Sequence, residues 1–400
     1  MPLLQPSVKL PLKLRLARDL TRSLKRGHPW VFAEALRHLP AAPPGSPAIL
    51  LDNKKGREIA RGFYDPTSPL AFRAGTTEPD EPLDESWAER RLQRAVALRR
   101  RLFDARTTGF RLLNGEGDGL PGLICDVYGQ TAVIQLDGPG PSGFWHGPGL
   151  ATWLAEALSL TCVYHKPQSR SGGSGQLLAG SLPSEPVPFL ENGLNFRADI
   201  VHGQKTGFFL DQRENRQRIQ QLSAGRRVLN VFGYTGGFSV AAGVGGAETV
   251  TTVDLAGPAL ALAEVHWQAN GLEPTRHQTR KADAFNFLEV AAKKEQWWEV
   301  VIVDPPSFAS AKESVPQALQ AYQKLVAGGA AVTAPAGVLA AASCSSHVDQ
   351  ESFLQACQEG LSKARRRATL LGLYGQPADH PTPLAFPEFR YLKFVLLRVD

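Results

Sequence analysis

Hydrophobic and polar residues change their spacing near residue 189 of this 400-residue chain. Beyond that point, short apolar runs alternate with segments in which apolar residues recur every three or four positions. The runs predict buried strands and the segments predict helices. Such alternation predicts a mostly parallel sheet with helices on both faces, which is a Rossmann-like α/β fold. Strands are expected at 227–232, 249–253, 300–303 and 338–342, and helices at 237–244, 258–269 and 316–326.

The first 188 residues show a different pattern, in which short strands separated by turn residues accompany two basic helices. The strands are expected at 48–52, 58–64, 70–73, 111–114, 122–126 and 132–136, and the helices at 21–28 and 87–104. An acidic, proline-containing linker is expected at 76–84, and the serine- and glycine-rich stretch 169–180 is expected to be a flexible loop. We therefore predict a small β-rich domain at 1–77, an α+β central domain at 78–188 and the α/β domain at 189–400.

Apolar content and cysteine placement exclude several classes of protein. The longest apolar runs, such as 300–303 and 337–342, are too short to span a bilayer, and the N-terminus lacks the apolar block of a signal peptide. We therefore expect a cytoplasmic protein that makes no contact with a membrane. The four cysteines lack the close pairing of a zinc site and are too sparse for a disulfide framework, so no metal site is predicted.

Positive charge is concentrated in the N-terminal residues of the chain. The net charge is +6, but residues 1–77 hold 13 lysines and arginines against 5 acidic residues. A localised basic surface suits a polyanion, because each neutralised phosphate releases condensed counterions. The alternative is a basic face that is merely solvated.

A glycine-rich turn follows the first strand of the α/β half. The sequence Gly233-Tyr234-Thr235-Gly236 lets the backbone turn sharply and approach a ligand, and Asp254 ends the next strand, where its carboxylate can accept hydrogen bonds from a ribose. This pattern predicts a nucleoside-cofactor site. The glycine spacing differs from G-x-G-x-x-G, which favours a cofactor without a pyrophosphate over a dinucleotide. A purely structural strand-to-helix connection is the alternative.

Two further strand ends supply chemistry. Asp304 precedes Pro305 and Pro306, which must end the strand and stiffen the loop, so that a carboxylate is held where it can orient a base. Cys344 follows the strand at 338–342 and is expected to face the same cleft. A thiolate there could add to carbon-6 of a pyrimidine and activate carbon-5, although a buried cysteine is more often a packing residue. The other three cysteines are best explained by packing.

Taken in order, these motifs resemble those of the RlmI-like family of bacterial 23S rRNA cytosine-C5 methyltransferases. The motifs concerned are 205–213, 230–236, Asp254, Asp283, 304–306 and 343–345. The resemblance extends to the rest of the chain: residues 27–32, 62–64 and 72–73 resemble that family's RNA-binding PUA domain, a small β-barrel, residues 114–123 resemble the start of its central domain, and residues 378–381 and 391–393 resemble its C-terminal motifs.

The resemblance implies S-adenosylmethionine (SAM) as the cofactor, 23S rRNA as the substrate, carbon-5 of cytosine as the methyl acceptor and often a homodimer. Asp304 would orient the cytosine and Cys344 would be the nucleophile. Asp283 would contact the adenine end of SAM, although an aspartate before a helix is more often an N-cap. By position, the SAM-binding residues would be Phe209, Asp211, Arg213, Phe232, Gly233, Tyr234, Thr235, Gly236, Asp254, Asp283 and Ala284, and the substrate-binding residues Pro305, Pro306 and Phe308.

Three alternatives stay open. Relatives with this Asp-Pro-Pro loop include a guanine N7 methyltransferase, in which case Cys344 would be structural. A non-catalytic RNA-binding assembly factor on the same scaffold is disfavoured, because the cofactor turn, Asp254 and Asp304 are all present. An NAD-dependent oxidoreductase is the least favoured, since the glycine spacing differs and the basic domain would have no role.

Overall fold

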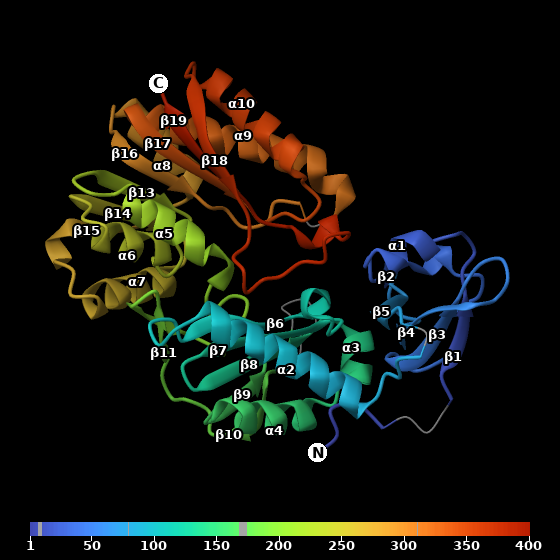
Figure 1. The fold of residues 1–400 in the computed structure, drawn as a ribbon. Helices are drawn as coiled ribbons and strands as arrows, with labels where there is room; N and C mark the ends of the chain where they lie inside the picture. The colour runs from blue at the N-terminus through green and yellow to red at the C-terminus, as the bar shows by residue number, and fades with distance from the viewer. Residues whose placement is uncertain (7–9, 79, 168–173, 310) are drawn as a thin grey trace. The chain divides into compact units, whose positions relative to one another are not determined.

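The structure is a computed structural model that describes residues 1–6, 10–78, 80–167, 174–309 and 311–400 (Figure 1). Its contacts divide the chain into two compact units. The first consists of residues 1–193, 198–210 and 378–387, and the second of residues 194–197, 211–377 and 388–400. The strands β11 (Val187–Glu191) and β12 (Leu194–Ala198) lie where the chain passes from one unit to the other.

The N-terminal part of the first unit contains a five-stranded sheet, in the order β1-β3-β4-β5-β2. The strands are β1 (Leu12–Arg15), β2 (Trp30–Val31), β3 (Ser46–Leu51), β4 (Glu58–Tyr64) and β5 (Phe72–Thr76), and the helix α1 spans Thr21–Lys25. Its core contains Leu14, Leu24, Leu50 and Phe72. The sheet and this core confirm the β-rich domain expected from the turn-separated apolar runs.

A second five-stranded sheet, in the order β10-β9-β8-β7-β6, forms the centre of the same unit. Its elements are α2 (Glu85–Leu102), β6 (Gly109–Asn114), β7 (Leu123–Tyr128), β8 (Thr131–Leu136), α3 (Pro139–Phe144), α4 (Gly147–Leu158), β9 (Cys162–His165) and β10 (Gln176–Gly180). The expected helix at 87–104 is α2, whose N-cap Asp84 accepts a hydrogen bond from the backbone N–H of Trp87 at 2.8 Å.

One prediction for this region is wrong. Residues 176–180, which we expected to belong to a flexible loop, form β10 and pair with β9. All five residues of β10 are exposed or half-buried, and its apolar run is only Leu177 to Ala179, too short to distinguish an edge strand from a loop. Residues 169–173 of the same stretch lie outside the described residues.

One buried ion pair joins the sheet β1-β3-β4-β5-β2 to the turn Gly115–Asp118, and a second holds that turn to α2. The carboxylate of Glu116 accepts hydrogen bonds from the indole of Trp30 at 2.7 Å and from Arg73 at 2.6 Å. Arg99 of α2 holds both carboxylate oxygens of Asp118, at 2.6 and 2.8 Å. The motif at 114–123 therefore has a structural role that the sequence did not reveal.

The second unit is built on a seven-stranded sheet in the order β15-β14-β13-β16-β17-β19-β18. The first five of these strands run parallel, and β19 is antiparallel to both of its neighbours. The strands are β13 (Arg227–Val231), β14 (Thr249–Asp254), β15 (His277–Lys281), β16 (Trp298–Val303), β17 (Thr333–Ser343), β18 (Ala368–Tyr374) and β19 (Lys393–Val399).

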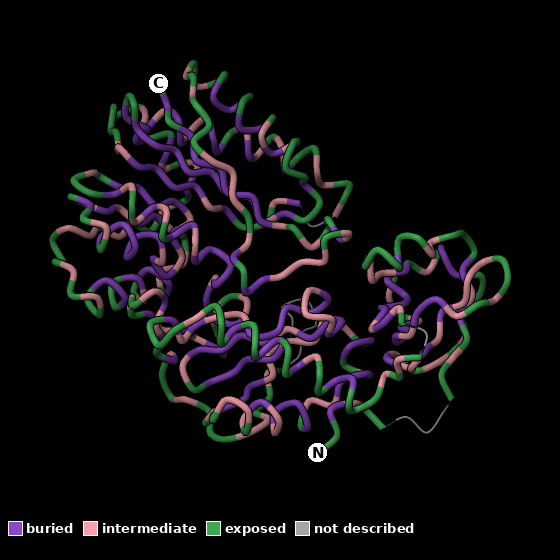
Figure 2. Tube along the Cα trace, in the orientation of Figure 1, coloured by how far each residue is buried: buried purple, intermediate pink, exposed green. Residues whose placement is uncertain are grey.

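Helices cover both faces of this sheet (Figure 1). On one face Ile219, Phe238 and Trp267 pack against even-numbered residues of β13 and β16, and on the other Leu288, Tyr322 and Phe353 pack against the odd-numbered residues of those strands. Figure 2 shows the buried residues gathered along the strands. The helices are α5 (Arg213–Gln221), α6 (Gly237–Val244), α7 (Gly257–Ala269), α8 (Ala284–Lys293), α9 (Val315–Val332) and α10 (Gln350–Lys363). This architecture confirms the predicted Rossmann-like fold.

Candidate cofactor and nucleophile site

Three parallel strands bring the predicted chemistry to one edge of the sheet. Val231 of β13 is in register with Val253 of β14 and with Val303 of β16. The residues after them therefore share the carboxyl edge, with the glycine turn after β13, Asp254 at the end of β14 and Asp304 after β16. After β13 the chain adds β14 and β15 on one side and then returns to add β16 on the other side of β13. This edge is therefore the switch point where open α/β sheets bind ligands.

The turn after β13 requires its glycines. A Cβ on Gly233 would lie 2.4 Å from the side chain of Thr252, and Gly236, with φ +76°, begins α6 against Ala263. Two non-glycine residues in the same turn, Phe232 and Tyr234, also have positive φ values of 60° and 46°. Such backbone strain is typical of ligand clamps.

Asp254 is fixed by the turn itself. Its two carboxylate oxygens accept hydrogen bonds from the backbone N–H groups of Tyr234 and Ala256, both at 2.8 Å. A carboxylate has about four acceptor sites, so lone pairs remain for ribose hydroxyls. The buried hydroxyl of Thr235 has no hydrogen-bond partner among the described residues. An unsatisfied hydroxyl in the strained turn and a half-buried carboxylate hydrogen-bonded to that turn fit a nucleoside cofactor.

Sequence reasoning missed a histidine that supports this turn. His266 of α7 is fully buried, and its Nδ1 lies 2.8 Å from the carbonyl oxygen of Thr235 while its Nε2 accepts from the backbone N–H of Arg197 at 2.9 Å. Burial lowers the pKa of His266 to about 4, so the ring is neutral. Its position in the buried stripe of α7, after Ala259 and Ala263, was the available signal.

Asp304 is oriented by a chain of amides. Gln212 donates from Nε2 to Oδ2 of Asp304 at 3.0 Å, and Asn215 donates to Oε1 of Gln212 at 2.6 Å. Both amides are buried. Asp211, in the same motif, accepts from the hydroxyl of Tyr391 at 2.8 Å. The predicted carboxylate is thus held in one orientation by Gln212, which the sequence analysis did not select.

The loops that follow β16 and β17 are joined by hydroxyl groups. The hydroxyl oxygen of Ser345 lies 3.0 Å from that of Ser307 and 2.9 Å from that of Tyr322, whose hydroxyl also accepts from Ser343 at 2.9 Å. The Sγ of Cys344 lies 4.0 Å from the carbonyl oxygen of Pro305. These contacts bring the predicted nucleophile to the Asp-Pro-Pro loop.

Among the four cysteines, Cys344 is the only one that is not fully buried; Cys125, Cys162 and Cys357 are 0%, 1% and 2% exposed. Burial raises the pKa of all three buried thiols, that of Cys357 to about 12. A thiol that stays protonated is a poor nucleophile. The burial of Cys125, Cys162 and Cys357 agrees with the packing role expected for these three residues.

The other predicted residues have varied environments. Asp283 caps α8, accepting from the backbone N–H of Asn286 at 2.9 Å, and Ala284 begins that helix. Pro305 is buried and Pro306 is exposed. Phe308 is half-buried with its ring 4.9 Å from that of Tyr322. Arg213 is a buried residue of α5, whereas Phe209 belongs to the first unit, so its role at the cofactor stays a prediction.

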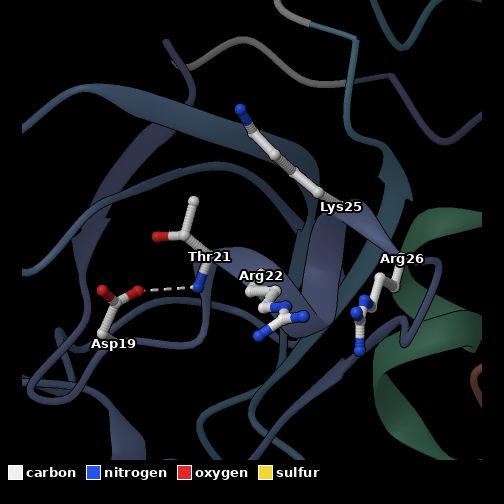
Figure 3. Close-up of a pocket in the computed structure, with 5 residues that line it drawn as sticks. All are labelled: Asp19, Thr21, Arg22, Lys25 and Arg26. Atoms are coloured by element: carbon white, nitrogen blue, oxygen red, sulfur yellow. Dashed lines mark hydrogen bonds between the residues drawn. The ribbon is translucent and has the colours of Figure 1, made fainter.

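Part of the basic charge of the N-terminal domain lies around a surface cavity of about 590 Å³ (Figure 3). Arg22, Lys25 and Arg26 of the α1 region line it with Thr21 and Asp19. The carboxylate of Asp19 accepts from the backbone N–H of Thr21 at 3.0 Å, and this hydrogen bond lowers the pKa of Asp19. Three exposed cations around one cavity suit an anionic ligand.

The strand order, the glycine turn and the half-buried carboxylate at the end of β14 are typical of enzymes that bind a nucleoside cofactor. A model of the S-adenosylmethionine-dependent methyltransferase family matches residues 150–363, and a PUA-like domain model matches residues 14–76. The chain is 38% identical to a ribosomal RNA large subunit methyltransferase of Deinococcus radiodurans, over 97% of this chain and 98% of that protein. It is 34% identical to ribosomal RNA large subunit methyltransferase I of Aeromonas salmonicida, over 96% and 98% of the two chains.

Solved structures agree with this assignment. A methyltransferase complexed with SAH superposes with a TM-score of 0.85 at 25% identity, covering 97% of this chain and 100% of that one. A SAM-dependent methyltransferase from Streptococcus mutans shares the fold, with a TM-score of 0.84 at 24% identity and the same coverage. The chain belongs to the S-adenosylmethionine-dependent methyltransferase family, which confirms the predicted cofactor and the resemblance to the RlmI-like enzymes.

No helix within the described ranges is long and apolar enough to cross a membrane. Among those same residues, no three histidine, cysteine or acidic side chains are grouped so that they could hold a metal ion.

Proposed function

We propose that this protein methylates carbon-5 of a cytosine in 23S rRNA, with Cys344 as the nucleophile and Asp304 as the residue that orients the base. The observation that supports it most is the hydroxyl-linked pair of loops, in which Cys344 approaches Pro305 beside a carboxylate fixed by Gln212. The relatives named for ribosomal RNA support the substrate class.

In this mechanism the Cys344 thiolate forms a bond to carbon-6 of cytosine, and the displaced electron pair makes carbon-5 nucleophilic. Asp304 accepts a hydrogen bond from the exocyclic amine and holds the ring. When bound, SAM supplies an electrophilic methyl group to carbon-5. Loss of the carbon-5 proton to a base then expels the thiolate and regenerates Cys344.

The cofactor would be held by the turn 233–236 and by Asp254, with Asp283 and Ala284 at its adenine end. The exposed cations of the α1 cavity would contact phosphates of the RNA, because they group three positive charges on the PUA-like domain. We retain the division into domains at 1–77, 78–188 and 189–400 and the homodimer as proposals, the latter to be checked by sedimentation equilibrium.

The test is transfer of labelled methyl from SAM to unmodified 23S rRNA, followed by nucleoside analysis. We expect 5-methylcytosine, no product with Cys344→Ala and unchanged SAM binding by that variant in calorimetry. The matched control is Cys357→Ala, which removes a buried cysteine of α10. RNA that contains 5-fluorocytosine should trap a covalent adduct with the wild type and with Cys357→Ala, but not with Cys344→Ala. A Cys344→Ala enzyme with full turnover, or a methylated guanine as the product, would refute the proposal.

A further inference from the structure

A buried lysine lies directly beside the nucleophile's loop. Lys393 begins β19 and pairs with Ser343 of β17, the residue before Cys344. It is only 4% exposed. Lysine is among the residues least often buried, and an ammonium group is removed from water only where it is fully hydrogen-bonded.

The ammonium group of Lys393 donates three hydrogen bonds to backbone carbonyl oxygens. These belong to Ser345 at 2.6 Å, Val348 at 2.7 Å and Tyr391 at 2.7 Å. An ammonium has three hydrogens and a neutral amine has two, so only the charged form satisfies all three carbonyls. Two of the acceptors lie in the segment that immediately follows Cys344. The conformation of the loop 344–348 is therefore stabilised by the charged form of Lys393.

We propose that Lys393 is a positioning residue for Cys344, which fixes the loop 344–348 and stabilises the Cys344 thiolate by its charge. This inference rests on the proposed role of Cys344 as the nucleophile. All three ammonium hydrogens are used by carbonyls, so Lys393 acts on the sulfur through space. The thiolate is favoured without a hydrogen bond that would have to break when the sulfur attacks carbon-6.

Other charged and titratable groups near the loop oppose or moderate this effect. Asp304 stands before the Pro305 carbonyl that Cys344 contacts, Tyr322 reaches the loop from α9, and Asp349 caps α10. Burial lowers the pKa of Lys393 to about 8, while the negative charges of Cys344 and Asp349 oppose this. The charges of Lys393 and Cys344 therefore interact where β19 pairs with the end of β17.

The chain offers a direct measurement of the Cys344 thiolate. Because the other three cysteines are at most 2% exposed, iodoacetamide applied to the folded protein should alkylate Cys344 selectively. The alkylation rate followed against pH gives the midpoint at which the thiolate forms. The experiment uses neither RNA nor SAM, so its outcome is independent of whether carbon-5 of cytosine is the true target.

In Lys393→Met, which keeps the length of the side chain, we expect the midpoint to rise by about one pH unit and the rate below the midpoint to fall about tenfold. Lys363→Met is the control for net charge, since Lys363 lies on an exposed part of α10. It should leave the midpoint unchanged. A purely structural role would alter the rate at all pH values and leave the midpoint in place.

A reciprocal measurement avoids any change at Lys393. Coupling between two titrating groups is mutual, so Cys344→Ser should lower the pKa of Lys393 by about as much as Lys393→Met raises that of Cys344. Proteins labelled with ¹³Cε-lysine would report the Lys393 pKa by NMR, even if Lys393→Met failed to fold. An unchanged Lys393 pKa in Cys344→Ser, or an unchanged midpoint in folded Lys393→Met, would overturn the proposal.

Discussion

His266 is the residue whose replacement should test the cofactor turn most directly. Its Nε2 accepts from a backbone N–H, which can only donate, so the proton of the neutral ring is on Nδ1 and is donated to the Thr235 carbonyl. His266→Phe keeps the aromatic volume but removes both hydrogen bonds. It leaves the Arg197 N–H and the Thr235 carbonyl without this partner.

The expected cost follows from these two groups. A buried donor or acceptor that loses its partner costs about 1–3 kcal/mol, so His266→Phe should destabilise the second unit by about 2–6 kcal/mol. The turn 233–236 should open more often, and SAM affinity should fall by about tenfold or more. Hydrogen–deuterium exchange of peptides that cover the turn and α7 measures the opening, and calorimetry measures the affinity.

The same residue predicts a dependence of stability on pH. Its pKa is about 4 in the folded protein and about 6.5 when unfolded, so between these values the unfolded chain binds the extra proton. Its contribution is therefore complete above pH 6.5 and is lost as the pH falls toward 4. Between pH 7 and pH 5 the wild type should lose about 2 kcal/mol more than His266→Phe in urea denaturation.

The exposed His38, in the first unit, provides the matched control as His38→Gln, which should keep the wild-type exchange and the wild-type pH slope. If His266→Phe showed wild-type protection of the turn and the wild-type slope between pH 7 and pH 5, His266 would not support the turn 233–236.

Three further predictions concern the other polar contacts. Gln212→Leu should lower kcat about tenfold with little change in SAM affinity, since it frees the carboxylate that orients the base; steady-state kinetics with calorimetry separates the two effects. Glu116→Gln should destabilise the first unit by about 2–4 kcal/mol in urea denaturation, because Arg73 keeps only its second acidic partner; an unchanged midpoint would contradict a structural role for this motif. The double variant Arg22→Ala/Lys25→Ala should reduce the slope of log affinity for RNA against log salt by about 2; an unchanged slope would remove the α1 cavity from the RNA interface.

The elements predicted best from the sequence are the strands of the seven-stranded sheet that helices cover on both faces. The strands expected at 227–232, 249–253 and 300–303 correspond to β13, β14 and β16 with small differences at their ends. A strand covered by helices on both faces must be apolar throughout, so its run is easily recognised. The carboxyl edge of the sheet followed from them, because parallel strands separated by helices end on the same side.

The predictions were wrong at a glycine pair inside a helix, α9, and at an edge strand, β10. The helix expected at 316–326 continues as α9 to Val332, through Gly328 and Gly329. Glycine pairs usually weaken a helix, but here a Cβ on Gly329 would lie 2.9 Å from the side chain of Leu339, so the residue permits close packing of α9 on β17. The sequence shows the weak helix former without showing the strand that requires it.

The polar residues that support the site could not be found by the same reasoning. Gln212, His266 and Lys393 each lie far along the chain from the group they hold. The partners of His266 and Lys393 are backbone groups, which carry no signal in the sequence. A motif search selects residues by their neighbours in sequence, whereas these three are selected by the topology that places α7 against the cofactor turn and β19 beside β17. What the sequence does contain is a conflict: a histidine in a buried helical stripe and a lysine at the start of an apolar strand. Because burying either residue without a hydrogen-bond partner would cost several kcal/mol, each conflict predicts a specific buried acceptor or donor nearby. In this protein both conflicts are resolved at the carboxyl edge of the sheet, where the cofactor turn and Cys344 must be held.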